Sequence, residues 1–469
     1  MTNNTSLPFS ALSLNPDLLH NLASLGFTDM TPIQAESLPA ILDGKDVIAQ
    51  AKTGSGKTAA FGLGLLNKLD VKKFRIQTLV LCPTRELADQ VAKDIRKLAR
   101  AIHNIKVLTL CGGMPFGPQV GSLEHGAHIV VGTPGRIEDH VNRGTLILDH
   151  LDTFVLDEAD RMLEMGFEPS LDAILEKVPT NRQTLLFSAT FPEKIQTIAS
   201  NIMNNPSMVK VESNHEATSI QQFFYRVSND SERIIALRLL LLEYTPTSAI
   251  VFCNTKIETQ DTAKELSRHG FSAAALHGDL EQRDRDQTLV RFSNKSVSVL
   301  VATDVAARGL DIEDLDMVVN FHIARDAEVH THRIGRTGRA GSSGIACSLF
   351  SDREVHKVIK FDATFDPVTQ SNQLPPQTLL ANRPEKPTTV TLQIDGGKKQ
   401  KVRPGDILGA LTSKKNKSGT VITGNDVGKI QIFDHCAYVA INTQLVKSAL
   451  TILSEGKIKG RSFRVRQIR

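Results

Sequence analysis

The sequence predicts an α/β protein with two parallel-sheet domains in tandem and a smaller α+β domain at its C-terminus. Short, continuously apolar segments alternate with amphipathic ones over most of the chain, a pattern typical of parallel strands covered by helices on both faces. The alternation pauses at two polar, proline-containing stretches, which divide it into three parts. The chain has 469 residues, which is more than one hydrophobic core normally organises.

The first domain is expected over residues 1–204 and the second over 205–365. A polar stretch at 205–220 separates the two, and a linker at 366–387 with five prolines follows the second. In the first domain the expected strands are 46–51, 78–83, 106–111, 128–132, 153–157 and 183–187. In the second they are 222–227, 248–253, 272–276, 298–302, 317–321 and 345–350.

The C-terminal domain, residues 388–469, has its own pattern and a strong positive charge. Its expected elements are a strand at 389–394, a helix at 406–411, strands at 429–433 and 437–441, a helix at 443–454 and a strand at 462–468. The order βαββαβ is typical of ferredoxin-like or RRM-like domains. From residue 388 onward there are 15 Lys and Arg against 5 Asp and Glu, while the remainder holds 40 against 46. A net charge of +10 on one small domain predicts a polyanionic partner.

Several classes of protein are disfavoured by composition. The five cysteines are scattered without a CxxC pair, which suits neither a zinc site nor a disulfide framework. The first residues, MTNNTSLPF, lack the pattern of a signal peptide. No apolar run approaches the length of a membrane span. We therefore expect a soluble, cytoplasmic protein.

A phosphate-binding loop is predicted at residues 51–58, AKTGSGKT, because it lies between an expected strand and an expected helix. Small residues let backbone N–H groups approach phosphates, and a helix N-terminus adds partial positive charge. Lys57 is expected to reach the β- and γ-phosphates, and the Thr58 hydroxyl to hold Mg²⁺. The pattern usually begins with Gly, whereas this chain has Ala51. The ATP-binding residues in this loop are Thr53, Gly54, Ser55, Gly56, Lys57 and Thr58.

An acidic pair ends the expected strand at 153–157. Asp157 is predicted to hold Mg²⁺, and Glu158 to orient and deprotonate the attacking water. If the pair stood alone, a charged turn opening the next helix would be the favoured explanation. Together with the phosphate loop, however, the pair predicts an ATPase.

The remaining motifs resemble those of the DEAD-box ATP-dependent RNA helicases. The resemblance covers roughly residues 7–365 and includes every motif in order. It implies two RecA-like domains, ATP and Mg²⁺ as cofactors, and RNA as partner. The motifs are GFTDMTPIQ (26–34), AKTGSGKT (51–58), PTREL (83–87), GG (112–113), TPGR (133–136), DEAD (157–160), SAT (188–190), IVFCNT (250–255), Gln282 with Arg285, ATDVAARGLD (302–311) and HRIGRTGR (332–339).

The same resemblance implies roles around the nucleotide. Gln34 would bond the adenine edge, and Phe9 would pack on the base. Asp311 would contact the ribose. Arg336 and Arg339 would act as catalytic arginine fingers, with Lys57, Asp157 and Glu158 completing the catalytic set. Coupling between the ATP state and domain closure is implied for Ser188, Thr190 and His332.

Positions that grip the RNA backbone in this family also have counterparts. They lie in both domains and combine arginines with small residues, which allow close approach to phosphate. Because phosphate and sugar contacts carry no sequence information, the core is expected to bind RNA without sequence preference. The residues are Arg85, Gly113, Thr133, Arg136, Arg285 and Thr303.

The C-terminal domain resembles that of the bacterial DbpA (DEAD-box protein A) subfamily, through residues 401–414 and 428–441. This implies binding to a hairpin of large-subunit ribosomal RNA and a role in ribosome assembly. Few aromatic residues lie on its expected strands, so electrostatic binding is favoured over base stacking. The expected RNA-binding residues are Lys398, Lys399, Lys401, Arg403, Lys414, Lys415, Lys417 and Tyr438.

Other functions remain open at this point. A processive DNA translocase would share the two-domain fold. A general mRNA or cold-stress helicase would use the basic domain without preference. An ATP-gated RNA clamp would bind both ligands without efficient unwinding. No membrane and no obligate protein partner is inferred.

Overall fold

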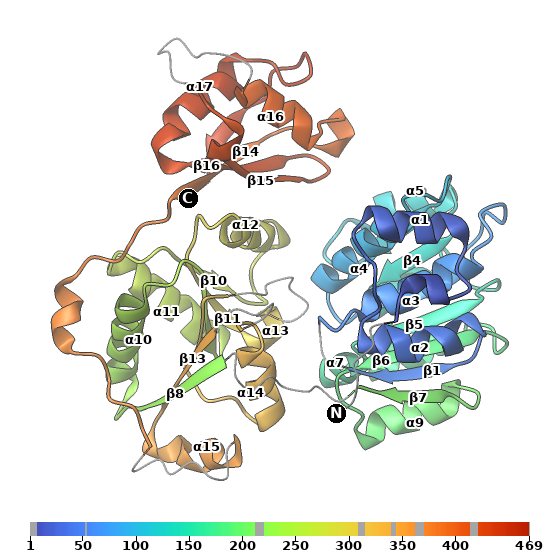
Figure 1. The fold of residues 1–469 in the computed structure, drawn as a ribbon, viewed down its shortest axis with the longest axis horizontal. Helices are drawn as coiled ribbons and strands as arrows, with labels where there is room; N and C mark the ends of the chain where they lie inside the picture. Colours follow the sequence, from blue (N-terminus) through green and yellow to red (C-terminus); the bar gives the residue numbers. More distant parts are fainter. Residues whose placement is uncertain are drawn as a thin grey trace. The chain divides into compact units, whose positions relative to one another are not determined.

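The structure is a computed structural model that describes residues 7–51, 54–211, 220–307, 315–338, 344–361, 370–412 and 421–468. The chain divides near residue 215 into two compact units. The first is an N-terminal α/β domain, here domain 1. The second contains a further α/β domain, domain 2, and the C-terminal domain (Figure 1).

Domain 1 is built on a seven-stranded sheet in the order β3-β4-β2-β5-β6-β1-β7. Every neighbouring pair in it is parallel. Parallel strands need crossover connections, and the helices between them supply these. The strands are β1 (Val47–Gln50), β2 (Thr78–Leu81), β3 (Val107–Leu110), β4 (Ile129–Gly132), β5 (Thr153–Asp157), β6 (Gln183–Ser188) and β7 (Ser207–Lys210).

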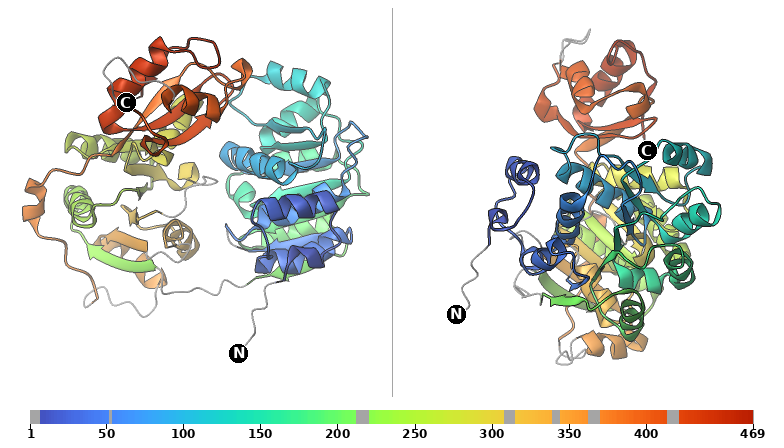
Figure 2. Two further views of the ribbon diagram at one scale, coloured as in Figure 1. Left: turned by 45° about the horizontal axis from the view of Figure 1, so that its top comes forward. Right: turned by 90° about the vertical axis from the view of Figure 1, so that its right-hand side faces the viewer.

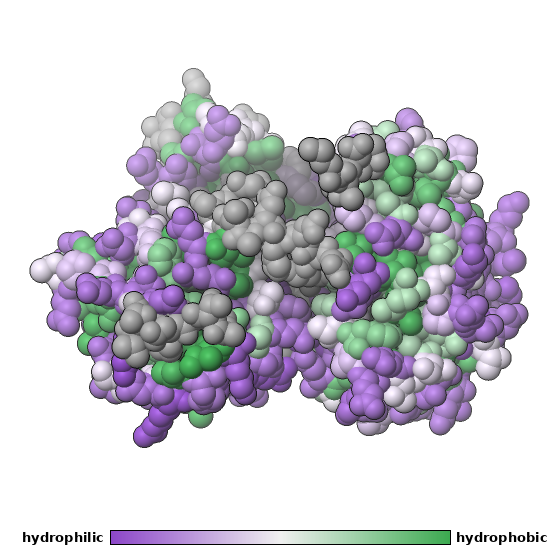
Figure 3. All heavy atoms as spheres, turned by 60° about the horizontal axis from the view of Figure 1, so that its bottom comes forward, coloured by the Kyte–Doolittle hydropathy of each residue, from purple (hydrophilic) through white to green (hydrophobic). Residues whose placement is uncertain are grey.

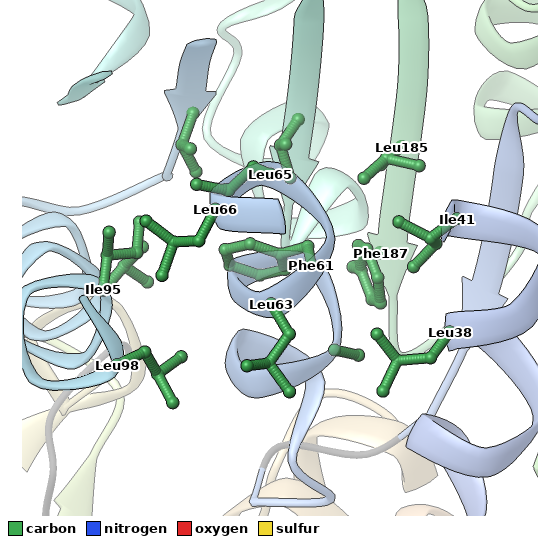
Figure 4. Close-up of a cluster of buried hydrophobic side chains, with 14 of the residues drawn as sticks. Leu38, Ile41, Phe61, Leu63, Leu65, Leu66, Ile95, Leu98, Leu185 and Phe187 are labelled. Atoms are coloured by element: carbon green, nitrogen blue, oxygen red, sulfur yellow. The ribbon is translucent and has the colours of Figure 1, made fainter. Parts of the chain in front are cut away.

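Hydrophobic clusters cover both faces of this sheet. Along β1, Val47 and Ala49 belong to one cluster and Ile48 to the other, as the two-residue period of a strand requires. Figure 4 shows the first cluster, in which Phe61 of α3 lies between Ile95 of α4 and Leu38 of α2. The helices are η1 (Phe9–Ala11), α1 (Pro16–Ser24), α2 (Pro32–Leu42), α3 (Lys57–Lys68), α4 (Arg85–Leu98), α5 (Phe116–Glu124), α6 (Pro134–Asn142), α7 (Ala159–Glu164), α8 (Glu168–Leu175) and α9 (Glu193–Ile202).

Domain 2 repeats the plan with a six-stranded parallel sheet in the order β10-β11-β9-β12-β13-β8. Figure 2 shows it with helices on both sides of the strands. Its strands are β8 (Ile220–Arg226), β9 (Ala249–Cys253), β10 (Ala273–Leu276), β11 (Val299–Thr303), β12 (Met317–Asn320) and β13 (Gly344–Phe350). Its helices are α10 (Asp230–Tyr244), α11 (Lys256–Arg268), α12 (Gln282–Ser293), α13 (Asp304–Ala307), α14 (Ala327–Ile334), η2 (Asp352–Glu354) and α15 (Val355–Phe361).

The proline-rich segment after domain 2 follows the surface of that domain. Asn372 extends the sheet at its β8 edge, where its N–H donates to the Phe224 carbonyl at 2.8 Å. The side chain of Leu374 packs on the domain core. The short helix η3 (Gln377–Ala381) then contacts α10. The linker is therefore bound to domain 2 from Asn372 to Ala381.

The C-terminal domain has the predicted βαββαβ order and a four-stranded antiparallel sheet, β15-β16-β14-β17. One face of the sheet packs with α16 and α17 around a core that includes Leu392, Ile407 and Val439. The elements are β14 (Thr389–Ile394), η4 (Lys398–Gln400), α16 (Pro404–Thr412), η5 (Gly424–Asp426), β15 (Val427–Ile432), β16 (Ala437–Asn442), η6 (Thr443–Leu445), α17 (Val446–Glu455) and β17 (Val465–Gln467).

The opposite face of this sheet is docked on the end of α12. Thr391, which is fully buried, accepts a hydrogen bond from the Asn294 amide at 3.2 Å and bonds the Ser296 hydroxyl at 2.6 Å. Lys429 donates to the Ser293 hydroxyl at 2.7 Å. These polar contacts bury both faces of β14, so the C-terminal domain is held against domain 2.

The architecture confirms the predicted fold class of two tandem parallel-sheet domains and a C-terminal RRM-like domain. One strand was not anticipated. β7 lies in the expected linking stretch at 205–220, yet it pairs with β1, so the first sheet continues past residue 204. None of the described helices is long and apolar enough to cross a membrane. On the face drawn in Figure 3, hydrophilic side chains dominate the described surface and hydrophobic ones form small groups.

Candidate nucleotide and RNA sites

The predicted phosphate loop connects β1 to the start of α3, as its motif requires. Gly54 and Gly56 have φ values of +80° and +93°, a region that side chains disfavour. Gly56 is the N-cap of α3, so the helix begins with Lys57. The Lys57 ammonium is buried and donates to the Ala51 carbonyl at 3.0 Å. Thr58 follows in the first turn of α3 and is half-buried. The backbone N–H groups at this helix start form an anion-binding site.

Gln34 of α2 and Thr31, the N-cap of that helix, contact this loop. The Gln34 amide donates to the Gly56 carbonyl at 3.0 Å, and the Thr31 hydroxyl donates to the Ser55 carbonyl at 2.8 Å. A Cβ at Gly56 would lie 2.5 Å from the Gln34 side-chain nitrogen, so the contact requires glycine. Gln34 thus links the segment predicted to read adenine to the loop predicted to hold phosphate. Phe9, the other predicted base contact, is only 4% exposed and packs in the domain core.

The predicted acidic pair lies at the C-terminal end of β5, where ligands of parallel sheets bind. Asp157 is buried, and its Oδ1 has no hydrogen-bond partner among the residues that the structure describes. Burial raises the pKa of Asp157 to about 7, although the nearby Lys57 lowers it. Glu158 has φ +53°, a left-handed conformation uncommon for a residue with a side chain. A buried carboxylate oxygen without a partner, close to Lys57, has the donor chemistry that a hard divalent cation needs.

Ser188 and Thr190, predicted to couple ATP state to closure, bond to the last residue of the acidic motif. The Thr190 backbone N–H and hydroxyl each donate to Asp160 Oδ2 at 2.9 Å. The Asp160 N–H donates to the Ser188 hydroxyl at 3.2 Å, and the Ser188 carbonyl accepts from the Ala51 N–H at 3.0 Å. A hydrogen-bonded path therefore connects the phosphate loop, the DEAD segment and the SAT segment. Asp160 was not among the predicted site residues, although its motif was.

Four predicted RNA-contacting residues of domain 1 meet around one turn, residues 112–114. Gly113 has φ +70°, and a Cβ there would lie 1.8 Å from the Arg85 guanidinium. The Gly112 N–H donates to the Thr133 hydroxyl at 3.4 Å. Arg136 donates to the Met114 carbonyl at 2.9 Å. The turn thus brings two arginines, a hydroxyl and a side-chain-free backbone together, as a phosphate contact surface requires.

The two predicted RNA residues of domain 2 also lie together. Arg285 on α12 donates to the Ala306 carbonyl at 2.9 Å, in the helix that directly follows Thr303. Thr303 is buried, and its hydroxyl accepts from the Ala306 N–H at 3.4 Å. On α14 and the turn after it, His332 and Arg336 are both half-buried.

Arg333 is a functional candidate that sequence reasoning missed. Only 2% exposed, it forms a bidentate pair with Asp304 at 2.6 and 2.8 Å. It also donates to the Asn254 side chain at 3.3 Å. One guanidinium thereby joins the IVFCNT, ATDVAARGLD and HRIGRTGR segments. The sequence feature that could have pointed to Arg333 is its position next to His332 in the HRIGRTGR motif.

In the C-terminal domain, basic residues from two distant segments lie together. Lys398, Lys399, Lys401 and Arg403 are exposed, and the Lys459 ammonium donates to the Lys401 carbonyl at 2.9 Å. Tyr438 differs from expectation. It is 3% exposed, and its ring packs edge-on against Phe433, so no ring face is open to a base.

Six predicted residues lie outside the described part of the chain. They are Thr53, Asp311, Arg339, Lys414, Lys415 and Lys417.

Three protein families match successive parts of this sequence. The DEAD/DEAH box helicase family matches residues 31–198, the helicase conserved C-terminal domain matches 232–341, and the DbpA RNA binding domain matches 391–467. These ranges fall in domain 1, domain 2 and the C-terminal domain. They define an ATP-dependent RNA helicase with an additional RNA-binding domain.

Individual relatives agree with these matches. The ATP-dependent RNA helicase DbpA of Escherichia coli (strain K12) is 52% identical over 462 residues, covering 98% of this chain and 99% of that one. The DEAD-box ATP-dependent RNA helicase CshA of Geobacillus kaustophilus is 46% identical over 357 residues, covering 76% of each. The chain therefore belongs to the DEAD-box ATP-dependent RNA helicases and is of the DbpA type.

Solved structures show the same core. S. cerevisiae Dbp5 bound to RNA and ADP BeF3 superimposes with a TM-score of 0.69 at 30% identity, covering 76% of this chain and 94% of that one. Mss116p bound to single-stranded RNA and AMP-PNP gives a TM-score of 0.71 at 28% identity, covering 81% and 82%. The resemblance to DEAD-box helicases predicted from the motifs is confirmed.

Proposed function

We propose that this helicase locally unwinds short RNA duplexes during assembly of the large ribosomal subunit, and that its C-terminal domain holds a hairpin of large-subunit RNA. The observation that carries the proposal is the C-terminal domain itself. It presents a basic surface and is docked on domain 2 through α12, whose first turn holds the predicted RNA contact Arg285. RNA bound by this domain is therefore kept close to the helicase core, where its effective concentration is high.

In the ATP site, the chain's own residues have distinct tasks. Lys57 and the N-terminus of α3 bind the phosphates, and Gln34 recognises adenine. Thr58 and Asp157 would hold Mg²⁺, which supplies charge neutralisation to the phosphates. Glu158 orients the attacking water and accepts its proton. Burial raises the pKa of Asp157 to about 7, so a bound cation would favour the ionised carboxylate that would serve as its ligand.

The remaining residues of the ATP site are proposed to come from domain 2 when the two domains close. We assign Arg336 and Arg339 as arginine fingers toward the γ-phosphate, and Asp311 as the ribose contact. The bonds from Asp160 to Ser188 and Thr190 support a coupling role for the SAT segment. His332 is assigned the same role from domain 2. Closure on ATP would bend one RNA strand so that its partner in a duplex dissociates.

We propose that the two helicase domains contact only the sugar–phosphate backbone of the RNA. In domain 1 these contacts come from the turn at 112–114 with Arg85, Thr133 and Arg136, and in domain 2 from Arg285 with Thr303. Because such contacts carry no sequence information, the choice of RNA falls to the C-terminal domain. There we assign binding to the loop residues Lys398, Lys399, Lys401 and Arg403, joined by Lys459. Tyr438 is left out because it is buried.

The test compares ATPase stimulation by a large-subunit RNA hairpin carrying a short duplex, by poly(A) and by single-stranded DNA. The variants are the full chain, a charge reversal K398E/K401E/R403E, and K447E as control. Lys447 is exposed in the first turn of α17. We expect strong stimulation by the ribosomal hairpin, lost in the triple variant and kept in the control.

Two results would point elsewhere. Equal stimulation by poly(A), unchanged in the triple variant, would favour a general mRNA or cold-stress helicase. Strong hairpin stimulation without strand separation in a displacement assay would favour an ATP-gated RNA clamp.

A further inference from the structure

Arg136, one of the assigned RNA-phosphate contacts, is fixed by neutral acceptors. Its Nη1 donates at 2.9 Å both to the Met114 carbonyl and to Gln119 Oε1. The Asp139 carboxylate is 3.6 Å from its Nε and is itself exposed, so it is screened by solvent. The guanidinium is therefore oriented by two neutral acceptors, and its contact with the Asp139 carboxylate is longer and solvent-screened. That combination suits a group that must bind phosphate.

Gln119 is the centre of this arrangement. It is buried on α5, and its amide nitrogen donates to the Cys111 carbonyl at 3.0 Å. Because a carbonyl can only accept, this contact directs Oε1 the other way, toward Arg136 and the His140 ring. His140 Nε2 lies 3.0 Å from the same Oε1. Gln119 Oε1 therefore accepts hydrogen bonds from both Arg136 and His140.

The surrounding rings hold Gln119 and Arg136 in place. Phe116 stacks on His140 with centroids 4.1 Å apart, and the Arg143 guanidinium lies 4.5 Å from the Phe116 centroid. His140 is fully buried, and its Nδ1 bonds the Thr145 hydroxyl at 2.8 Å. Burial, with Arg136 and Arg143 nearby and Asp139 opposing them, lowers the pKa of His140 to about 4. The imidazole is therefore neutral near pH 7 and adds no charge to the network.

We propose that Gln119 is a positioning residue for RNA binding, which aims Arg136 at the RNA backbone and must be uncharged to leave the arginine's charge available. The proposal rests on the RNA-contacting role assigned to Arg136 above. Two properties of the amide are required together. Its oxygen orients the guanidinium, and its neutrality preserves the attraction to phosphate.

The experiment measures the RNA concentration that half-saturates ATPase stimulation, using single-stranded poly(A) on the full chain. The variants are Q119L, Q119E, R136A and the double variant Q119L/R136A. Q196L serves as matched control, because Gln196 also donates from its amide to a backbone carbonyl of domain 1 but is exposed and far along the chain from the turn. Melting temperatures identify any variant that fails to fold.

We expect Q119L to raise the half-saturating RNA concentration about tenfold, the size expected for loss of one charge-assisted hydrogen bond. The rate at saturating RNA should change much less. Adding Q119L to R136A should have no further effect, because the arginine it positions is gone. Q119E keeps an acceptor but adds a charge, so RNA binding should weaken and its log–log salt slope should fall by about 0.7.

Three results would overturn the proposal. Normal RNA binding by Q119L beside weakened R136A would show that Arg136 acts without Gln119. Additive effects in the double variant would show a general structural role instead. Normal RNA binding by Q119E would remove the requirement for neutrality. If R136A itself binds RNA normally, the assigned role of Arg136 fails first, and the inference fails with it.

Discussion

Docking of the C-terminal domain on domain 2 depends on buried polar contacts at Thr391, and T391V should loosen it. Valine keeps the shape of threonine but removes its hydroxyl. The Asn294 amide then loses its acceptor inside the interface, whereas the Ser296 hydroxyl keeps its bond to the Arg291 carbonyl at 2.9 Å. Asn294 is only 4% exposed, and within the described part of the chain its Oδ1 already lacks a hydrogen-bond partner. Water therefore cannot replace the lost bond without opening the interface.

The expected magnitude follows from the cost of a stranded buried polar group, about 1–3 kcal/mol. Local opening of the interface should become about 5- to 150-fold more frequent. Amide hydrogen exchange reports such opening directly. We expect exchange to rise by this factor at the end of α12 and along β14, and not in the core of domain 1.

T451V provides the control. Thr451 lies exposed on α17, and its hydroxyl bonds only within that helix, to the Lys447 carbonyl at 3.1 Å. If amide hydrogen exchange at the end of α12 and along β14 is the same in T391V as in T451V, the reasoning is refuted. It would mean that the contacts at Thr391 add nothing to docking. A further consequence of looser docking is a weaker response of the ATPase to the ribosomal hairpin.

Three further predictions concern the core. G113A places a Cβ against the Arg85 guanidinium at φ +70°, so RNA affinity should fall several-fold in a binding titration while nucleotide affinity is retained. The pKa of Asp157 is raised from 3.8 to about 7 in the folded protein, so between these pH values the folded state holds a proton that the unfolded chain has released. The stability that this proton contributes is complete below pH 3.8 and is lost as the pH rises through 7. Nucleotide-free D157N should therefore show a smaller fall in melting temperature between pH 5 and 8 than the unsubstituted protein, and parallel curves would contradict this. D304N leaves Arg333 buried without its carboxylate, and should lower the unfolding free energy of domain 2 by about 3 kcal/mol in urea, whereas a change below about 0.5 kcal/mol would show that the pair is not needed.

Much of the site was predictable because its signals are local. The phosphate loop needs a strand, a run of small residues and a helix start, and all three are adjacent in the sequence between Val47 and Lys68. The acidic pair similarly marks the end of a strand. Motifs of this kind describe short-range geometry, which neighbouring residues largely fix. The order βαββαβ followed from hydrophobic periodicity for the same reason.

Contacts between distant residues could not be found in this way. Gln34 was predicted as an adenine contact, but nothing in its neighbourhood indicated that it also braces Gly56. Arg333 lies beside a predicted residue, and only the folded domain shows it joined to Asp304 and Asn254. Gln119 carries no motif signal that the sequence reasoning used. Each depends on a side chain that contacts a residue 17 to 79 positions away in the sequence.

The sequence by itself determined the fold class, the two RecA-like domains, the ATPase motifs and the charge of the C-terminal domain. Tertiary structure decided which surfaces remain accessible. β14 alternates polar and apolar residues, which predicts one solvent-facing side, yet docking on α12 buries that side as well. Tyr438 is buried on the adjacent strand. The physical reason is that alternation reports only how a strand presents its faces, whereas their burial depends on a complementary surface elsewhere in the chain.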